Sequence, residues 1–234
     1  MNIFFGTDGW RAYLDSHIND ATVAVVAQAF ADHINQKGNN QKVAVAFDTR
    51  RCSQSFARIF SEVLSGNGIY VLLSDKVVPT PVLSFTTRNM GCAAGVMITA
   101  SHNPPVYNGI KFKSGLGGPF SSEETKTIEK LLYASEIRQS ETNISIINML
   151  PDYIEHIESL IDFNAIHEAG IPLLIDSMGG AGQTVLQELL HKHGCDATTI
   201  FGDASETFHG RLAEPIEQNL APLMYELGRG NFAF

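Results

Sequence analysis

The sequence predicts a layered α/β fold, and two patterns carry that prediction. Short apolar runs bounded by turn-forming residues recur along the 234-residue chain, as the strands of a buried sheet do. Between them lie longer segments whose apolar residues recur every three to four positions, as on one face of an amphipathic helix. Strands that alternate with helices in this way are typical of folds in which helices cover a sheet.

The elements expected in the first 140 residues follow from these patterns and from capping residues. Asn19 or Asp20 caps a helix over 19–38, where the apolar residues share one face. Ser121 and Glu124 form a capping box at the start of another helix. The remaining expected elements are strands at 43–47, 69–73, 93–99 and 109–112, and helices at 53–64, about 79–89 and 121–133.

A second domain is expected after residue 150. Residues 136–150 carry polar residues and then isoleucines before Pro151, so we place domain 1 at 1–140 and domain 2 at 150–234. Because domain 2 has too few strands to complete a sheet, and open strand edges promote pairing between chains, we expect self-association or poor solubility. Its expected elements are a helix at 151–161, a strand at 173–176, a helix at 182–193 and a strand at 197–201.

Composition narrows the possible partners and the compartment. A formal net charge of −9 and a pI near 5.3 argue against nucleic acid or an anionic membrane as a partner. The three cysteines have no metal-type spacing, and Cys92 and Cys195 fall in or beside apolar segments, where buried thiols are expected. The sequence shows no signal peptide and no membrane-length apolar span, so we expect a reducing cytoplasm.

The most informative string is Thr99-Ala100-Ser101-His102-Asn103-Pro104, which directly follows the apolar run 93–98. The prolines at 104 and 105 end the strand because proline removes a backbone donor and fixes φ. Ser101 is therefore expected at the C-terminal end of a strand, where open α/β sheets hold their ligands. From spacing alone, the interpretation as an ordinary turn serine stays open.

Other candidate residues are cationic or basic. The planar fork of Arg11 suits phosphate oxygens, although it could instead pair with Asp8 or Asp15; its neighbour Trp10 is expected to be exposed. His102 and Lys111 are candidates for proton transfer, and a capping or solvent role for His102 stays open.

Two other motifs favour structural roles. The glycine-rich segment 176–182 is expected to be a tight turn rather than a phosphate cradle, because it lacks the known nucleotide patterns. His191 and His193 do not share a helix face, which argues against a metal pair.

Six strings together resemble the α-D-phosphohexomutases, the family of phosphoglucomutase and phosphomannomutase. The serine string resembles the family's phosphoserine loop, and the other matches follow the family's order over nearly the whole chain. They are Phe5-Gly6-Thr7-Asp8-Gly9-Trp10-Arg11-Ala12, Asp48-Thr49-Arg50 with Ser53, Asn108-Gly109-Ile110-Lys111-Phe112-Lys113, Asp176-Ser177-Met178-Gly179-Gly180-Ala181-Gly182 and Glu214-Pro215. The resemblance implies α/β/α domains with mixed sheets, namely a phosphohexomutase domain I and an incomplete domain II.

The resemblance also implies a reaction and a set of site residues. Phospho-Ser101 would donate its phosphoryl group to a hexose phosphate, and a hexose bisphosphate would be the intermediate and activator. The implied catalytic residues are Ser101, His102, Lys111 and Arg11. We expect Asp48 and Arg50 to pair or to support the serine loop from behind. The residues expected to bind substrate or phosphate are Thr7, Asp8, Gly9, Asn103 and Arg50.

Magnesium is the cofactor that the resemblance implies, with phospho-Ser101 as one ligand. The family's aspartate ligands are expected beyond Phe234, as are the third and fourth domains that bind the sugar. We therefore expect the chain to be insufficient for turnover by itself. One alternative is a truncated, non-catalytic paralogue or fragment that binds phosphosugar or a partner chain. Another is a phosphatase or hydrolase that uses Ser101, for which no metal cage or base pattern is seen.

Overall fold

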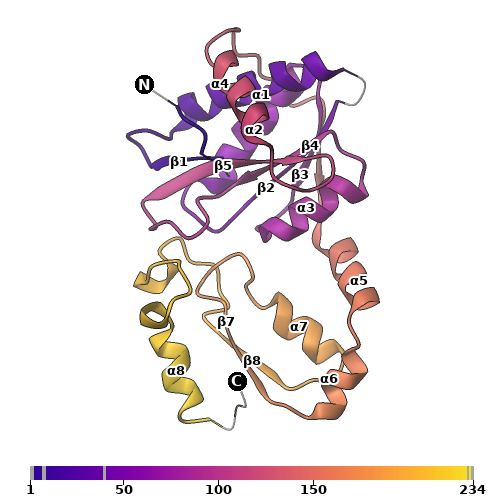
Figure 1. The fold of residues 1–234 in the computed structure, drawn as a ribbon, viewed down its shortest axis with the longest axis vertical. Coiled ribbons are helices and arrows are strands. Elements are labelled where there is room, and N and C mark those ends of the chain that lie inside the picture. Colours follow the sequence, from indigo (N-terminus) through magenta and orange to yellow (C-terminus); the bar gives the residue numbers. More distant parts are fainter. Residues whose placement is uncertain (1–2, 7–8, 39–40, 231, 233–234) are drawn as a thin grey trace. The chain divides into compact units, whose positions relative to one another are not determined.

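The computed structural model describes residues 3–6, 9–38, 41–230 and 232, which divide into two compact units (Figure 1). The first unit lies within residues 1–100 and 106–150, and the second within 101–105 and 151–234. None of the described helices is long and apolar enough to cross a lipid bilayer.

A six-stranded mixed sheet forms the centre of the first unit. The strand β5 runs antiparallel to both of its neighbours, and the remaining neighbours are parallel. The strands expected near 43–47, 69–73 and 93–99 are confirmed, and the one expected at 109–112 is longer. The order across the sheet is β1 (Trp10–Tyr13), β5 (Tyr107–Ser114), β4 (Ala94–Ile98), β2 (Lys42–Phe47), β3 (Tyr70–Ser74) and β6 (Ile144–Ile147).

Helices cover both faces of this sheet. On one face lie α1 (Asp20–Lys37), α2 (Ser53–Gly66) and α4 (Ser122–Leu131), and on the other lies α3 (Thr80–Asn89) (Figure 1). Side chains of β4 alternate accordingly. Val96 belongs to the core cluster that includes α1 and α2, whereas a Cβ on Gly95 would lie 2.3 Å from Oγ1 of Thr87 in α3. This arrangement confirms the layered α/β/α fold with a mixed sheet.

The helix ends follow from local hydrogen bonding. The backbone N–H of Thr22 donates to the Asn19 side chain at 3.1 Å, which caps α1. The capping box of Ser121 and Glu124 at the start of α4 is confirmed. The helix α4 ends at Leu131, two residues before the expected end, because Leu132 is extended (φ −58°, ψ 130°).

Two short strands of this sheet were not expected. Trp10, predicted to be exposed, is only 5% exposed because it lies in β1 beside β5. Residues 144–147, expected to belong to the connection between domains, form β6 and pair with β3. Strands of four residues are too short for an alternating pattern to identify them.

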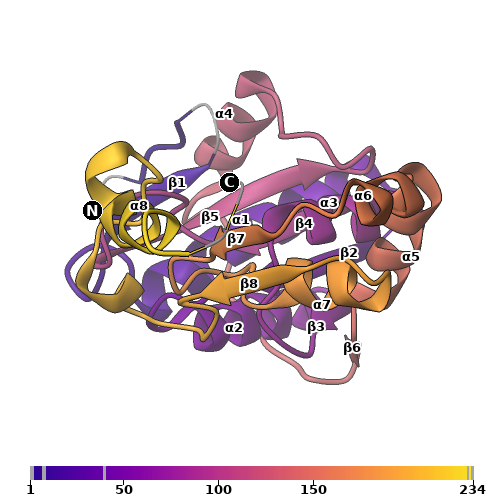
Figure 2. The same ribbon diagram turned by 90° about the horizontal axis from the view of Figure 1, so that it is seen from below.

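The second unit contains a two-stranded parallel sheet and several helices. Figure 2 shows β7 (Leu173–Asp176) and β8 (Ala197–Ile200) side by side. The helices are α5 (Leu150–Leu160), α6 (Phe163–Ala169), α7 (Val185–Lys192) and α8 (Ala221–Leu227), with 3-10 turns at Phe208–Gly210 and Glu217–Leu220. The helices α6 and α8 were not expected, and α7 begins three residues later than expected.

A small apolar core holds the second unit together. Phe163 of α6 packs with Leu189 and Leu190 of α7 and with Ala197 of β8. Cys195 belongs to this cluster, and Cys92 is buried in the first unit, so both thiols are buried as expected. Burial raises the pKa of the Cys92 thiol to about 11, which keeps it protonated at neutral pH.

Candidate active site at the end of β4

Ser101 lies in the turn after β4, at the end of the strand where it was expected. Every residue of β4 is buried, whereas Ser101 itself is exposed. Its φ of 59° lies in the left-handed region, which residues other than glycine rarely adopt. Strained conformations of this kind cluster at active sites, but eight other described non-glycine residues also have a positive φ, so it is the sequence motif that singles out Ser101. In the same turn, His102 is exposed and Asn103 is half-buried.

Lys111 and Arg11 lie on neighbouring antiparallel strands. Arg11 of β1 is paired with Gly109 of β5, so Lys111 follows two residues further along β5. Lys111 is 7% exposed and Arg11 is half-buried. The first unit therefore places two of the predicted cationic residues in one region of its sheet.

Gly9 shows why the N-terminal motif requires glycine next to this region. Its φ is +94°, and a Cβ there would lie 2.2 Å from the carbonyl oxygen of Ile110 and 2.9 Å from Cα of Lys111. Only glycine permits this close approach to β5. Thr7 and Asp8, which were expected to bind phosphate, lie outside the described residues.

Arg11 also lines a cavity of about 350 Å³ in the first unit. The rings of Tyr13 and Tyr107 pack against each other in its wall, tilted by 35° with centroids 4.2 Å apart. Arg11 is thus beside an open space rather than within the apolar core. The other lining residues are Phe4, Trp10, Ala12 and His17.

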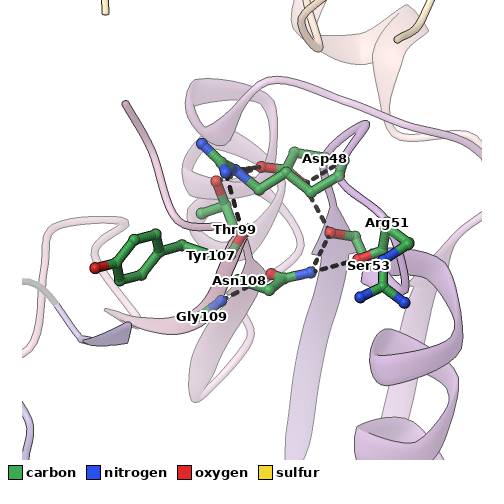
Figure 3. Close-up of polar contacts among 8 residues, drawn as sticks. Asp48, Arg51, Ser53, Thr99, Tyr107, Asn108 and Gly109 are labelled. Carbon is green, nitrogen blue, oxygen red and sulfur yellow. Dashed lines mark hydrogen bonds and ion pairs between the residues drawn. The ribbon is translucent and has the colours of Figure 1, made fainter. Parts of the chain in front are cut away.

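Asp48 and Arg50 form an ion pair close to the end of β4 (Figure 3). Nε of Arg50 lies 3.3 Å from Oδ2 of Asp48, and the Arg50 side chain is completely buried. Burial raises the pKa of the Asp48 carboxyl, while hydrogen bonds from Thr99 and Ser53 and the charge of Arg50 oppose that shift. The expected pairing is thus present. Direct contact of Arg50 with phosphate stays a prediction, because its guanidinium lies among protein groups.

Two buried polar residues beside this pair were not singled out from the sequence. Ser53 and Asn108 are both 0% exposed. Each belongs to a recognised motif, but a motif gives no sign of whether its serine or asparagine is buried. Asparagine is depleted in β-strands, so its presence at the second position of β5 is the signal that would have found Asn108.

The segment 176–182 in the second unit forms a tight turn. The backbone N–H of Met178 donates to Oδ1 of Asp176 at 2.8 Å, Gly179 has a φ of 68°, and the next helix, α7, begins only at Val185. The nearby histidines have separate partners: Nε2 of His191 lies 2.7 Å from the Ala197 carbonyl oxygen, and His193 contacts a glutamate. Among the described residues, no group of three or more His, Cys, Asp or Glu side chains is placed to hold a metal ion.

Comparison with known proteins gives matches over almost the whole chain. Among solved structures, a putative phosphomannomutase from Thermus thermophilus aligns with a TM-score of 0.90 and 36% identity, over 97% of this chain and 52% of that one. A "Probable phosphoglucosamine mutase" from Methanosphaera stadtmanae is 34% identical over 94% of this chain and 49% of its own length. A Staphylococcus aureus phosphoglucomutase is 33% identical over 80% of this chain and 36% of its own length. The chain thus spans between about a third and a half of these curated relatives.

Family models match both parts of the chain. Residues 2–138 match the phosphoglucomutase/phosphomannomutase alpha/beta/alpha domain I, and residues 151–231 match domain II of the same family. The two matches together cover most of the sequence in the order that the family uses. The chain therefore belongs to the phosphoglucomutase/phosphomannomutase family, the α-D-phosphohexomutases.

Proposed function

We propose that this chain carries the phosphorylated nucleophile of a phosphosugar mutase, which moves a phosphoryl group between the 1- and 6-positions of a hexose phosphate. The observation that carries the proposal is Ser101, held at positive φ in the turn three residues after the end of a buried strand, within the family's serine string. Family membership supports the reaction class. A phosphoserine at this position would bear about −1.5 to −2 charges at neutral pH.

The proposed step is a transfer between two oxygens. An oxygen of the sugar hydroxyl forms a bond to phosphorus, and the bond between phosphorus and Oγ of Ser101 breaks. One proton leaves the hydroxyl and one reaches Oγ, with Lys111 and His102 as the groups that move them. Arg11 would bind phosphate oxygens through its planar fork of donors. The resulting hexose bisphosphate would turn over in the site and return its other phosphoryl group to Ser101.

Magnesium is proposed for the complete enzyme, where it would neutralise charge on the transferred phosphoryl group. A hard cation of this size prefers six oxygen ligands. The described residues do not fit such a site by themselves, since no group of three or more suitable side chains gathers among them. We therefore expect residues 1–234 alone to have little turnover.

The test is Ser101 phosphorylation in the native protein purified from its source cells. Incubation with glucose 1,6-bisphosphate, followed by intact-mass and peptide mass spectrometry, should find one phosphoryl group on Ser101. The Ser101→Ala variant should lose both the modification and turnover of glucose 1-phosphate, mannose 1-phosphate and glucosamine 1-phosphate. Wild-type turnover in that variant would contradict the proposal.

A second variant tests proton transfer. Lys111→Met should lower kcat by about 10²- to 10⁴-fold, the range for loss of a general acid–base group, and leave KM nearly unchanged. A change confined to KM would mean that Lys111 only binds substrate. If the native protein binds phosphosugars but neither becomes phosphorylated nor turns them over, the non-catalytic alternative holds.

A further inference from the structure

Five polar side chains of the first unit form one hydrogen-bonded network, which we call the clamp (Figure 3). Four of them are at most 4% exposed, and the fifth, Asp48, is largely buried. They come from three segments that are distant in the sequence: the loop after β2 together with the first residue of α2, the residue after β4, and the beginning of β5. The clamp comprises Asp48, Arg50, Ser53, Thr99 and Asn108.

The first part of the clamp holds the point where the chain leaves β4. Oδ2 of Asp48 accepts a hydrogen bond from Oγ1 of Thr99 at 2.5 Å. Its other oxygen accepts from Oγ of Ser53 at 2.7 Å and from the backbone N–H of Arg50 at 3.0 Å. Thr99 stands two residues before Ser101, so this carboxylate fixes the start of the serine turn.

The second part holds the point where the chain returns. Nη1 of Arg50 donates to the carbonyl oxygen of Tyr107 at 3.1 Å, at the first residue of β5. Because Arg50 is also the ion-pair partner of Asp48, one buried pair holds both ends of the segment 100–106. The Tyr107 side chain points away from the clamp, and its backbone takes part (Figure 3).

Asn108 joins the two parts. Its Nδ2 donates to Oγ of Ser53 at 2.9 Å and to the carbonyl oxygen of Arg51 at 3.0 Å. Its Oδ1 accepts from the backbone N–H of Gly109 at 2.7 Å. The amide therefore links the N-terminus of α2 to the strand that carries Lys111.

The clamp lies at the point where the backbone pairing of β4 with β5 ends. The pairing of β4 with β5 ends at Ile98 and Ile110, and the Thr99 N–H then donates to the Gly109 carbonyl at 2.9 Å before the chain turns away. Side-chain bonds therefore hold the two strands at the end of their backbone pairing. Since replacing a buried polar network by apolar residues is often neutral for stability, stability alone does not account for this clamp.

We propose that Ser53 and Asn108 are positioning residues for phosphoryl transfer, an inference that rests on the proposed function. They hold the start of the Ser101 turn and the Lys111 strand at a fixed separation. Neither touches the reacting atoms; Ser53 acts through Asp48 on Thr99, and Asn108 acts on Gly109. A displacement of about 1 Å is enough to cost on the order of 10²-fold in rate, so loosening this link should lower kcat.

The experiment compares Ser53→Ala and Asn108→Ala with wild type, using the native-length protein in single-turnover phosphorylation of Ser101 by glucose 1,6-bisphosphate. The phosphorylation rate and kcat, corrected for the folded fraction, should fall by at least about tenfold, with KM nearly unchanged. The final extent of phosphorylation should be unaffected. Hydrogen exchange at the Gly109 amide should become faster in Asn108→Ala.

Ser61→Ala is the matched control. Ser61 lies on α2 as Ser53 does, is also 0% exposed, and donates within its own helix, to the Ala57 carbonyl at 2.7 Å. It should keep the wild-type rate. Wild-type rates in both clamp variants, or an equal loss in Ser61→Ala, would overturn the positioning role. A wild-type protein that never becomes phosphorylated would instead overturn the proposed function, and the positioning role with it.

Discussion

His33 is a buried imidazole in α1 for which the structure predicts a pH effect on stability. The residue is 5% exposed, its ring packs against Phe120 at 5.9 Å between centroids, and its buried Nε2 has no hydrogen-bond partner among the described residues. Burial, and secondarily the charge of Lys37, lowers the pKa of His33, while Glu124 of α4 opposes this shift. Lys37 and Glu124 themselves form an ion pair at 2.7 Å.

We expect acid to weaken the fold through His33. Its folded-state pKa is below the unfolded value of about 6.5, so the unfolded chain binds the proton first as pH falls. The stability that the neutral His33 contributes is fully present above about pH 6.5. It is lost as the pH falls below that value, by at most about 1.4 kcal/mol of unfolding free energy per pH unit. Urea unfolding at a series of pH values across this range should show that the free energy of unfolding depends less steeply on pH in His33→Leu than in wild type. The exposed His17→Leu should follow wild type, and an unchanged slope in His33→Leu would refute the assignment.

For single residues, the sequence predicted position along the chain better than burial in the fold. The serine string predicted the place of Ser101, because an apolar run and two prolines define where a strand stops. The sequence could not predict that Trp10, Ser53 and Asn108 are buried, since burial depends on segments that meet only in the fold. Pairing of Asp48 with Arg50 was within reach because the two residues are neighbours in sequence.

In the second unit, one arginine fixes a long loop to the end of β7. Nη1 and Nη2 of Arg211 donate to the two oxygens of Asp176 at 2.7 and 3.0 Å, and the Asp176 side chain is 1% exposed. The guanidinium also lies over the ring of Phe201, 4.2 Å from its centroid. Both the paired hydrogen bonds to Asp176 and the contact with the Phe201 ring require a planar guanidinium.

Arg211→Lys should therefore destabilise the second unit although it keeps the charge. The lysine cannot make the two parallel bonds, and the buried Asp176 loses a partner, at a cost of about 1–3 kcal/mol. Urea unfolding and faster hydrogen exchange over residues 201–220 measure this. Lys192→Ala removes an ion pair with Glu158 in which the lysine is 61% exposed, and should cost less than about 1 kcal/mol. Equal effects of the two variants would contradict the role given to the fork.

Elements were predictable where they are long or capped. The helices α1 and α4 carry capping boxes, and the strands β2 and β4 are continuous apolar runs, so their existence was readable from the sequence. The four-residue strands β1 and β6 carry too few positions to show a period. They form because longer strands offer them an edge to pair with, which is a property of the assembled sheet.

For the whole molecule, the charge is divided unequally along the chain. Residues 151–234 contain thirteen Asp and Glu against three Lys and Arg, whereas residues 1–150 contain twelve against thirteen. The same acidic segment contains the two-stranded sheet, and in the described part of the chain neither β7 nor β8 has a second strand beside it. Open edges favour pairing between chains, and like charge opposes it.

We therefore expect self-association that increases with salt. Exposed like charges are screened within about 10 Å at 0.1 M salt, so raising the ionic strength removes the repulsion and leaves the strand edges free to pair. Light scattering on a concentrated solution of the protein should give a larger mass at high salt than at low salt. Thr198→Lys places a charge on an exposed position of β8 and should reduce this mass, while Gln139→Lys adds the same charge on an exposed loop of the first unit and should not. A monomer at every salt concentration would show that these edges do not pair, and equal effects of the two lysines would show that association does not run through β8.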